Sequence, residues 1–294
     1  MRVGFVTQLL WPRYGDFWSK LVAGAGLEVV YPTAEAVRGR LGDAQLGAVP
    51  GLAFRLAAAQ ALALEADALL APQLNPSGGS TRGGGQDPFI ADFPEALATR
   101  LYGLPPVVGV PATLEVPLES LAVSTLLKLT HDPALVRRTW ERYRSRARAP
   151  RLPEVKWRVR PSEGETLGVL GQPWLLSSAL AERAAAHALP SEGAYLHIVS
   201  QHQLSPALLR EEGRRVDGGL VDTDLEVLGA ARFLGRKGSV GRLVMVADET
   251  SGADAWLVAK VQKLAYKPLT VVSVQALAQD APLHLLAAPD AGGP

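Results

Sequence analysis

Strand-like and helix-like segments alternate along this chain, and the alternation occurs in two separate blocks. The first block opens with a β-rich run at Val3–Thr7, helical apolar spacing at Phe17–Ala25 and a β-branched run at Leu27–Tyr31. Strand, helix and strand in this order are typical of a parallel sheet with crossover helices. An Ala/Leu-rich helix at Leu52–Glu65 and a buried type of strand at Ala68–Ala71 continue the pattern. Pro12 and Gly15 are expected to form a turn before the first helix.

The alternation stops in the middle of the chain and then restarts. After a long loop and a strand at Val107–Val110, two helical segments follow at Leu118–Leu129 and Pro133–Arg148, and the proline-containing stretch Ala149–Pro161 is expected to be a linker. A second strand and helix series then runs from Leu167 to Val274. We therefore predict an α/β protein with two doubly wound, Rossmann-like parallel-sheet domains joined by a helical crossover. The expected boundaries are 1–115 for the N-terminal domain, 116–161 for the crossover and linker, and 162–294 for the C-terminal domain.

Composition excludes several classes of function. The chain has 294 residues, enough for two domains, and its 30 Lys and Arg residues nearly balance its 29 Asp and Glu residues. This balance gives no reason to expect a nucleic acid or an anionic membrane as a partner. The segment Pro133–Arg148 is rich in arginine, and we interpret it as a solvated bridging helix. The N-terminal run is typical of a strand rather than a signal peptide, so we expect a cytoplasmic protein. Because there is no cysteine, disulfides, thiolate metal sites and thiol nucleophiles are excluded.

Ligands of open parallel sheets bind beyond the carboxyl ends of the strands, so the loops there are the candidate sites. The segment 77–85 contains five glycines and Arg82 and could wrap a phosphate with backbone amides. It lacks both the dinucleotide glycine spacing and the Gly-Lys-Ser/Thr ending of a phosphate loop, so we favour a surface loop.

Two other loops follow predicted strands of the second block. Gly171–Trp174 leads into a helix whose amino end could accept an anion, but an ordinary strand-to-helix turn is favoured. Asp248–Ala255 holds three carboxylates and two hydroxyls. It could be the wall of a polar pocket, or Ser251 could cap the next helix while Asp254 complements its dipole. The five histidines have neither metal spacing nor a partner that would indicate a catalytic triad.

Several ordered motifs resemble one known family. Asp87-Pro88 opens a segment that is similar to a Cys-Pro motif, Gly171-Gln172-Pro173-Trp174 is similar to a Gly-His-Pro-Tyr motif, and Ser251-Gly252-Ala253-Asp254 is similar to a Cys-Gly-Pro-Asp turn. Over nearly its whole length, at low identity, the chain resembles the D-component group of the 2-hydroxyacyl-CoA dehydratases, the benzoyl-CoA reductase-like family, and especially its activase-associated branch.

The departures from this family bear on chemistry. Asp87 and Ser251 stand where the family has cluster cysteines, and Gln172 stands where it has a histidine. The resemblance implies electron transfer to a CoA thioester through a four-iron cluster, energised by an ATP-driven activase. Carboxylate and hydroxyl oxygens are poor ligands for such a cluster, so this reaction cannot be carried over. We therefore expect no metal, no iron–sulfur cluster and no other cofactor.

The resulting hypothesis is a cysteine-free, non-redox relative of the D-component that binds a small ligand or a partner protein in an interdomain cleft. An activase-like or dehydratase-like subunit is the partner that the resemblance implies. The alternative is a non-redox enzyme acting on an acyl-CoA or phosphorylated metabolite, with Asp87, Asp248, Glu249 or Asp254 as acid and base. Since cluster ligands converge, Asp87 and Ser251 are expected to lie close together. The ligand-binding candidates are Asp87, Pro88, Gly171, Gln172, Asp248, Ser251, Gly252 and Asp254; no catalytic residue is assigned.

Overall fold

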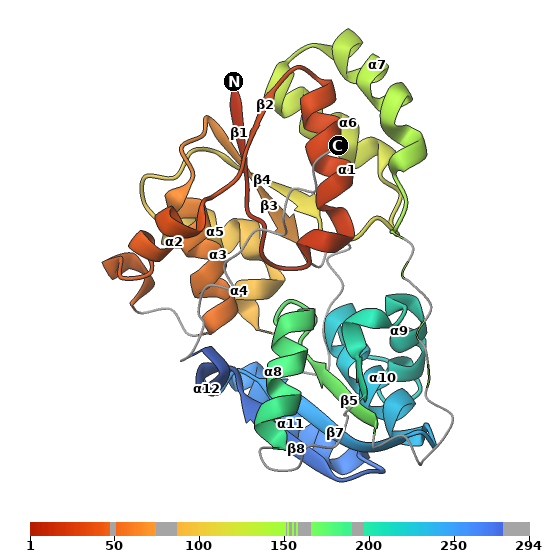
Figure 1. Ribbon diagram of the computed structural model, residues 1–294. Coiled ribbons are helices and arrows are strands. Elements are labelled where there is room, and N and C mark those ends of the chain that lie inside the picture. Colours follow the sequence, from red (N-terminus) through yellow and green to blue (C-terminus); the bar gives the residue numbers. More distant parts are fainter. Residues whose placement is uncertain are drawn as a thin grey trace. The chain divides into compact units, whose positions relative to one another are not determined.

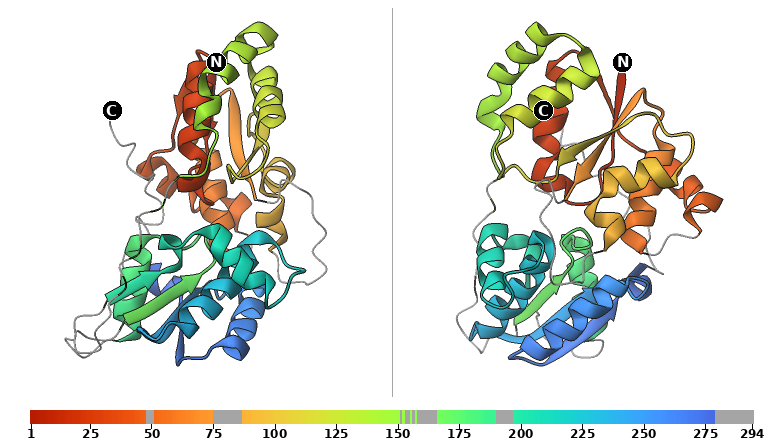
Figure 2. Two further views of the ribbon diagram at one scale, coloured as in Figure 1. Left: turned by 90° about the vertical axis from the view of Figure 1, so that its right-hand side faces the viewer. Right: turned by 180° about the vertical axis from the view of Figure 1, so that it is seen from behind.

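The chain folds into two compact units, each built around its own parallel sheet (Figures 1 and 2). The structure is a computed structural model that describes residues 1–47, 51–74, 87–150, 152, 155, 157, 166–189 and 197–278. The glycine-rich loop 77–85, most of the predicted linker 149–161 and the tail 280–294 lie outside the described residues.

The N-terminal unit contains a four-stranded parallel sheet of order β2-β1-β3-β4. Its strands are β1 (Arg2–Phe5), β2 (Glu28–Val30), β3 (Ala68–Gln73) and β4 (Val107–Pro111). Its α-helices are α1 (Trp11–Gly24), α2 (Ala34–Arg40), α3 (Leu52–Ala63), α4 (Pro88–Ala91), α5 (Phe93–Arg100), α6 (Glu119–Thr130) and α7 (Pro133–Tyr143), with short 3₁₀ turns η1 (Ala44–Leu46) and η2 (Arg144–Arg146).

The C-terminal unit repeats this plan with the order β6-β5-β7-β8. Its strands are β5 (Thr166–Gly171), β6 (His197–Ser200), β7 (Val240–Ala247) and β8 (Leu269–Ser273). Its helices are α8 (Ser178–Ala188), α9 (Pro206–Arg214), α10 (Asp222–Arg236), α11 (Gly252–Leu264) and α12 (Val274–Ala278), with the 3₁₀ turn η4 (Gln201–Gln203).

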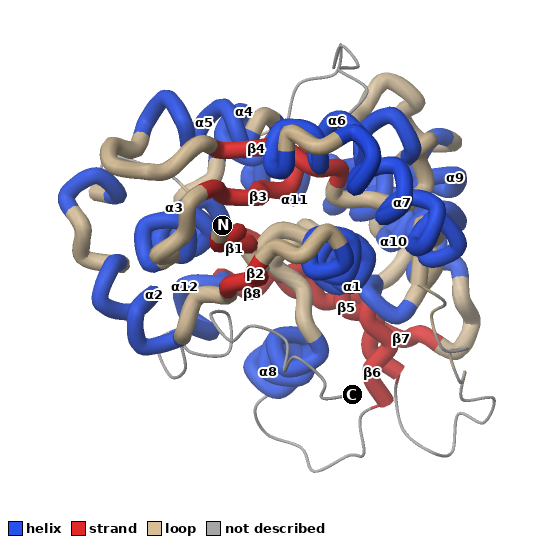
Figure 3. The backbone as a smooth tube through the Cα atoms, turned by 90° about the horizontal axis from the view of Figure 1, so that it is seen from above, coloured by secondary structure: helices blue, strands red, loops and turns tan. Residues whose placement is uncertain are grey.

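The predicted fold class, two doubly wound parallel sheets, is confirmed. In each sheet the first strand in the chain lies between the second and the third, so successive crossovers run in opposite directions from it. Helices consequently cover both faces of a sheet, as Figure 3 shows for α1 and α3 in the N-terminal unit. The edge between the first and third strands is the point at which the winding direction reverses, and there the loops at the carboxyl ends diverge.

The first strands of the two units carry a glycine at corresponding positions. Gly4 of β1 pairs with Leu69 of β3, and Gly168 of β5 pairs with Leu243 of β7. A Cβ atom on either glycine would lie 2.9 Å from the Cδ2 atom of its paired leucine. Both glycines therefore make room for a leucine of the neighbouring strand at the centre of the sheet.

Two details of the sequence prediction are wrong. Pro12 and Gly15 do not form a turn, because α1 already begins at Trp11. Proline is compatible with the first turn of a helix, where its missing N–H has no intrahelical partner. Gly15 lies within α1 and leaves room for the Trp11 indole, since a Cβ there would come within 2.3 Å of the ring.

The long loop predicted before β4 contains the short helices α4 and α5. Helix α5 begins with Phe93-Pro94 and buries Phe93 and Leu97, which lie one turn apart on one face. Phe93 packs edge-on against Phe54 of α3, with ring centroids 5.6 Å apart. The tertiary contact with α3 stabilises a segment whose length alone would not support a helix.

Helices α6 and α7, which lie in the predicted crossover, belong to the N-terminal unit. Tyr143, at the end of α7, packs against Gly24 of α1, where a Cβ would lie 2.2 Å from the tyrosine ring. Arg142 and Arg146 stack over the same ring at 5.5 and 5.9 Å from its centroid. The arginines of this segment are exposed, as expected for a solvated helix. In the described part of the chain no helix has both the length and the apolar character needed to cross a bilayer.

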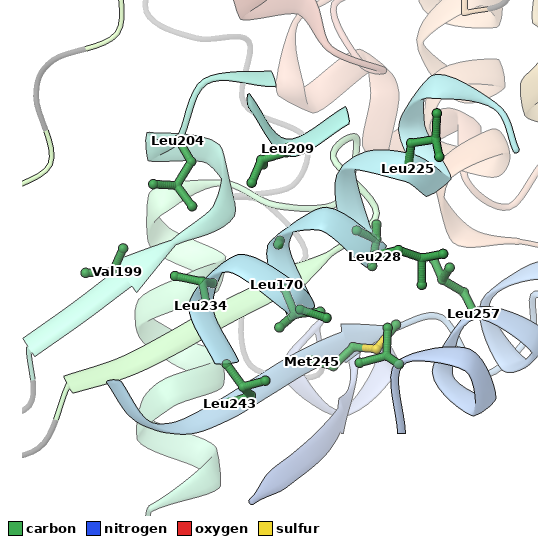
Figure 4. Packing of buried hydrophobic residues seen from close by; sticks show 14 of the residues in the cluster. Leu170, Val199, Leu204, Leu209, Leu225, Leu228, Leu234, Leu243, Met245 and Leu257 are labelled. Carbon is green, nitrogen blue, oxygen red and sulfur yellow. The ribbon is translucent and has the colours of Figure 1, made fainter. Parts of the chain in front are cut away.

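The core of the C-terminal unit forms where α10 packs on the sheet. Leu228 and Leu234 of α10 lie over Leu170 of β5 and Met245 of β7, and all four side chains are fully buried (Figure 4). Burying a side chain of this size contributes roughly 2 kcal/mol each. This packing fixes the amino end of α10 beside the carboxyl ends of β5 and β7.

Helices α9 and α10 approach each other unusually closely. A Cβ on Gly229 of α10 would lie 1.8 Å from the carbonyl oxygen of Leu209, and one on Gly213 of α9 would lie 2.1 Å from that of Leu225. Beside this contact the buried Arg210 pairs with the buried Glu226, the Nη1 to Oε1 distance being 3.2 Å. Only glycine permits this separation of the two helix backbones.

We predict that Gly229→Ala destabilises the C-terminal unit by roughly 3 kcal/mol or more, because the added methyl group must push the backbones of α9 and α10 apart. Urea unfolding followed by circular dichroism measures the change. Gly39→Ala is the matched control, since Gly39 lies within α2 and a Cβ there meets nothing within 4 Å. The control is expected to be neutral or slightly stabilising, by about 0.5–1 kcal/mol. Equal stability of the two variants would contradict the packing described here.

Candidate ligand site at the C-terminal sheet

The candidate site lies at the carboxyl ends of β5 and β7, where the winding of the C-terminal sheet reverses. Gly171, the last residue of β5, pairs with Val246 of β7, and a Cβ on it would lie 2.5 Å from the carbonyl oxygen of Val246. The backbones of the two strands therefore lie too close for a side chain at the end of β5. The polar residues that follow each strand emerge side by side.

The residue after β5, Gln172, reaches α10, the helix that precedes β7. Its Nε2 donates a hydrogen bond of 2.8 Å to Oδ1 of Asp224, in the first turn of α10. Both side chains are 1% exposed. The amide thus holds a carboxyl group in the interior, with the amino end of α10 favouring its negative charge.

A second glutamine joins the site from β6. Gln201, which begins η4 directly after β6, is 2% exposed, and its Oε1 accepts a bond of 3.2 Å from the backbone N–H of Gly171. Its neighbour His202 contacts Ser200 with an Nδ1 to Oγ distance of 2.7 Å. Burial lowers the pKa of His202, so this half-buried imidazole is neutral at pH 7.

The loop after β7 supplies two further carboxyl groups. The buried Asp248 accepts bonds at Oδ1 from Thr250, at 2.9 Å from the backbone N–H and 2.6 Å from the hydroxyl, and from Nε2 of Gln275 beyond β8. Ser251 caps α11 by accepting a bond of 3.3 Å from the N–H of Asp254. Asp254 in turn accepts a bond of 2.8 Å at Oδ2 from the N–H of Asp248.

Burial changes the titration of two of these carboxyl groups. The pKa of Asp254 is raised from 3.8 to about 7, chiefly by desolvation and also by the negative charges of Asp248, Asp224 and Asp87, although the Asp248 N–H bond opposes the shift. Desolvation also raises the pKa of Asp224 to about 6, against the lowering effect of the bond from Gln172. The charge of Asp224, in the first turn of α10, thus acts on Asp254, in the first turn of α11.

Three buried polar atoms of this group lack a hydrogen-bond partner within the part of the chain that the structure describes. They are Oε1 of Gln172, Nε2 of Gln201 and Oδ2 of Asp224. A buried polar atom left unpaired costs on the order of 1–3 kcal/mol, so three in one place indicate a site that something else completes. We call Gln172, Gln201, Asp224, Asp248 and Asp254 the switch-point cluster.

The structure brings together most of the predicted ligand-binding residues. Gly171, Gln172, Asp248, Ser251 and Asp254 all contribute hydrogen bonds at the carboxyl end of the C-terminal sheet. Ser251 caps α11, as the capping interpretation of this loop predicted, whereas the polar pocket wall stays a prediction.

The remaining predicted residues contribute less. Gly252 begins α11, and a Cβ on it would meet nothing within 4 Å, so its small size is not required by packing. Glu249 is exposed and contributes only its N–H, which donates to Gln275. Pro88 begins α4 in the N-terminal unit. Half-buried Asp87 groups with the C-terminal unit, and its charge reaches Asp254, three residues after Ser251.

Sequence reasoning missed Asp224, Gln201 and Gln275. Gln201 and Gln275 follow strands β6 and β8, so the rule that ligands bind after the carboxyl ends of strands would have found both. Asp224 gave no such signal, since an acidic residue in the first turn of a helix is common for dipole reasons alone. Within the described ranges no three His, Asp or Glu side chains are arranged to hold a metal ion.

No family model, curated protein or solved structure shows significant similarity to this chain. The resemblance to the 2-hydroxyacyl-CoA dehydratase D-component therefore stays a prediction.

The N-terminal unit has a partial counterpart of the site. The N–H groups of Thr7 and Gln8, just beyond β1, donate to Oε1 of the fully buried Gln60 at 2.8 and 3.2 Å. Gln60 Nε2, like Gln201 Nε2, has no partner in the described part of the chain. Both first strands thus end on a buried glutamine, but the perturbed carboxyl groups lie at the C-terminal sheet.

We predict that Asp254 makes the protein less stable as the pH rises. A carboxyl group with a raised pKa binds more protons folded than unfolded, so its contribution is retained below pH 4 and lost as pH rises towards 7. The full effect of Asp254 is on the order of 4 kcal/mol. The stability of Asp254→Asn relative to the wild type should therefore increase as the pH is raised from 4 to 8.

Urea unfolding across this pH range measures the difference. The exposed Asp92, whose side chain makes no capping bond to α5, provides the control Asp92→Asn. Its stability relative to the wild type should change little with pH. A flat difference for Asp254→Asn as well would show that Asp254 is not a buried, perturbed acid.

Proposed function

We propose that this protein is a non-redox ligand-binding protein, and that the switch-point cluster holds a small polar molecule that donates hydrogen bonds. The observation that carries the proposal is the presence of two unpaired buried acceptors, Gln172 Oε1 and Asp224 Oδ2, beside an unpaired buried donor, Gln201 Nε2. A ligand with at least two donors and one acceptor would satisfy all three.

The chemistry of the cluster supports a donor-bearing ligand rather than an anion. Asp248, Asp254 and Asp224 provide carboxyl groups at one sheet edge, and Asp87 adds its charge. A phosphate or carboxylate placed there would meet like charges in a poorly solvated environment, which is strongly unfavourable. The phosphorylated or acyl-CoA metabolite of our alternative hypothesis therefore fits this cluster poorly through its anionic groups.

The resemblance in the sequence supports two further parts of the proposal. As a relative of the dehydratase D-component without cluster cysteines, the protein would act without electron transfer and could pair with an activase-like or dehydratase-like subunit. We also propose a cytoplasmic location with neither nucleic acid nor membrane as a partner, and the balance of 30 basic against 29 acidic residues supports the absence of these two partners.

A second candidate function, general acid–base catalysis on the bound molecule, is favoured by the two perturbed carboxyl groups. Groups that titrate near the working pH make the best proton donors and acceptors, and Asp224 and Asp254 have pKa values of about 6 and about 7. If a ligand is turned over, the rate should rise with pH through this range or pass through a maximum within it. Asp254→Asn should lower the rate of turnover at least roughly 100-fold.

We predict that a screen of polar metabolites by thermal shift finds ligands that stabilise the wild type but not Asp224→Asn. The substitution keeps the shape of the side chain but replaces the unpaired acceptor Oδ2 with an amide. The loss of a charge-assisted bond should weaken binding roughly 10- to 100-fold. Isothermal titration calorimetry measures this change.

Asp222→Asn provides the matched control, because Asp222 lies two residues earlier in the first turn of α10 and its side chain is 57% exposed. This variant should bind as the wild type does. If every ligand found binds wild type, Asp222→Asn and Asp224→Asn equally, the cluster is not the binding site.

A further inference from the structure

We infer that the ligand of the switch-point cluster carries a protonated amine, whose ammonium group binds between Asp224 and Asp254 and also donates to Gln172. This inference rests on the proposed function and goes further by assigning the charge and chemical class of the molecule. Three observations lead to it: the charge of the cluster, the orientation of Gln172, and the arrangement of the acidic side chains.

The charge of the cluster is not balanced by its surroundings. In the portion of the chain described here, neither Asp224 nor Asp254 forms an ion pair with a lysine, an arginine or a histidine, and the charges that act on Asp254 are all negative. Two arginines near α10 pair with other acids: Arg210 with Glu226, two residues beyond Asp224, and Arg232 with Glu212. Buried carboxylates are normally paired, so a cation is the charge that this site lacks.

Gln172 provides independent evidence of an unpaired acceptor. Its Nε2 donates to Asp224, which fixes the amide within the cluster, and the Oε1 of the same amide is buried and unpaired. Asp224 Oδ2 is unpaired as well. An ammonium group has three N–H donors, and it can therefore bond to Gln172 Oε1, to Asp224 Oδ2 and to the carboxyl group of Asp254.

The arrangement of the side chains favours an amine over a metal ion. Calcium and magnesium require six or more oxygen ligands in a defined shell. No group of three acidic or histidine side chains in the described ranges has such an arrangement. Asp254 Oδ2 and Asp248 Oδ1 are moreover already occupied by N–H donors. An ammonium ion needs only single hydrogen bonds in loose tetrahedral directions.

The test uses the full-length protein and a panel of primary amines, each compared with the alcohol and the carboxylate built on the same carbon skeleton, and with magnesium chloride at equal ionic strength. We expect thermal shifts from amines that exceed those of their alcohols, none from the carboxylates, and at least roughly tenfold weaker amine binding by Asp224→Asn. Gln172→Met serves as a second variant should Asp224→Asn fold poorly, and Asp222→Asn should behave as the wild type.

Calorimetry near pH 6.5 in two buffers of different ionisation enthalpy provides a second readout. The ammonium group stays protonated, and its charge favours the ionised form of Asp254, so the proton of Asp254 passes to the buffer as the amine binds. The charges of Asp224, Asp248 and Asp87 oppose that ionisation in the free protein. Proton release should therefore accompany amine binding and should be smaller in Asp254→Asn, where only Asp224 can still release a proton.

The outcomes separate the inference from the proposed function. Alcohols that bind as well as the amines, with loss in Asp224→Asn, would overturn the amine while leaving the ligand site in place. A shift from magnesium alone would assign the cluster to a metal and also overturn the amine. Stabilisation by the carboxylates, or by no member of the panel, would contradict both, and a water molecule filling the cluster would then account for the unpaired atoms.

Discussion

Parallel pairing between the first and third strands of each sheet is the constraint on which the rest of this structure depends. Because β5 lies between β6 and β7, its two crossovers run in opposite directions, and the chain segments after β5 and β7 emerge at one edge. At Gly171 the backbone of Val246 lies so close that there is no room for a side chain. The candidate site of the C-terminal unit depends on that edge, since the first turns of α10 and α11 are fixed against it.

The site balances two opposing effects. Packing of α10 on the sheet and on α9 removes Asp224 from water, which disfavours its ionised form, whereas the helix amino end and Gln172 favour that form. Asp254 experiences the same desolvation together with the charges of neighbouring acids. The result is a pair of carboxyl groups that titrate near neutral pH, in place of a pair that is permanently charged or permanently neutral. A cation in the cluster would shift that balance, because it lowers the free energy of the ionised forms.

Part of the site could be predicted and part could not, for a physical reason. The rule that functional groups follow the carboxyl ends of parallel strands identified Gln172, Asp248 and Asp254, because each is adjacent in sequence to a strand that periodicity reveals. Asp224 belongs to a helix and reaches the site only through the packing of α10, which depends on Gly229 approaching the Leu209 carbonyl. Similarly, the segment around Phe93 was predicted as a loop, since its contact with Phe54 of α3 is not visible in the local sequence.

The sequence by itself determined the α/β class, the division into two sheets and the exclusion of thiolate chemistry, because apolar periodicity and the absence of cysteine are local properties of the chain. Only the tertiary structure decided which carboxyl groups are perturbed. A pKa depends on the water removed and the charges brought near by other elements, and Asp224 and Asp254, 30 residues apart, meet only after α10 and α11 have packed on the sheet. The unpaired atoms of Gln172 and Gln201 are a property of the fold in the same sense, since burial creates the need for a partner that the residue alone does not have.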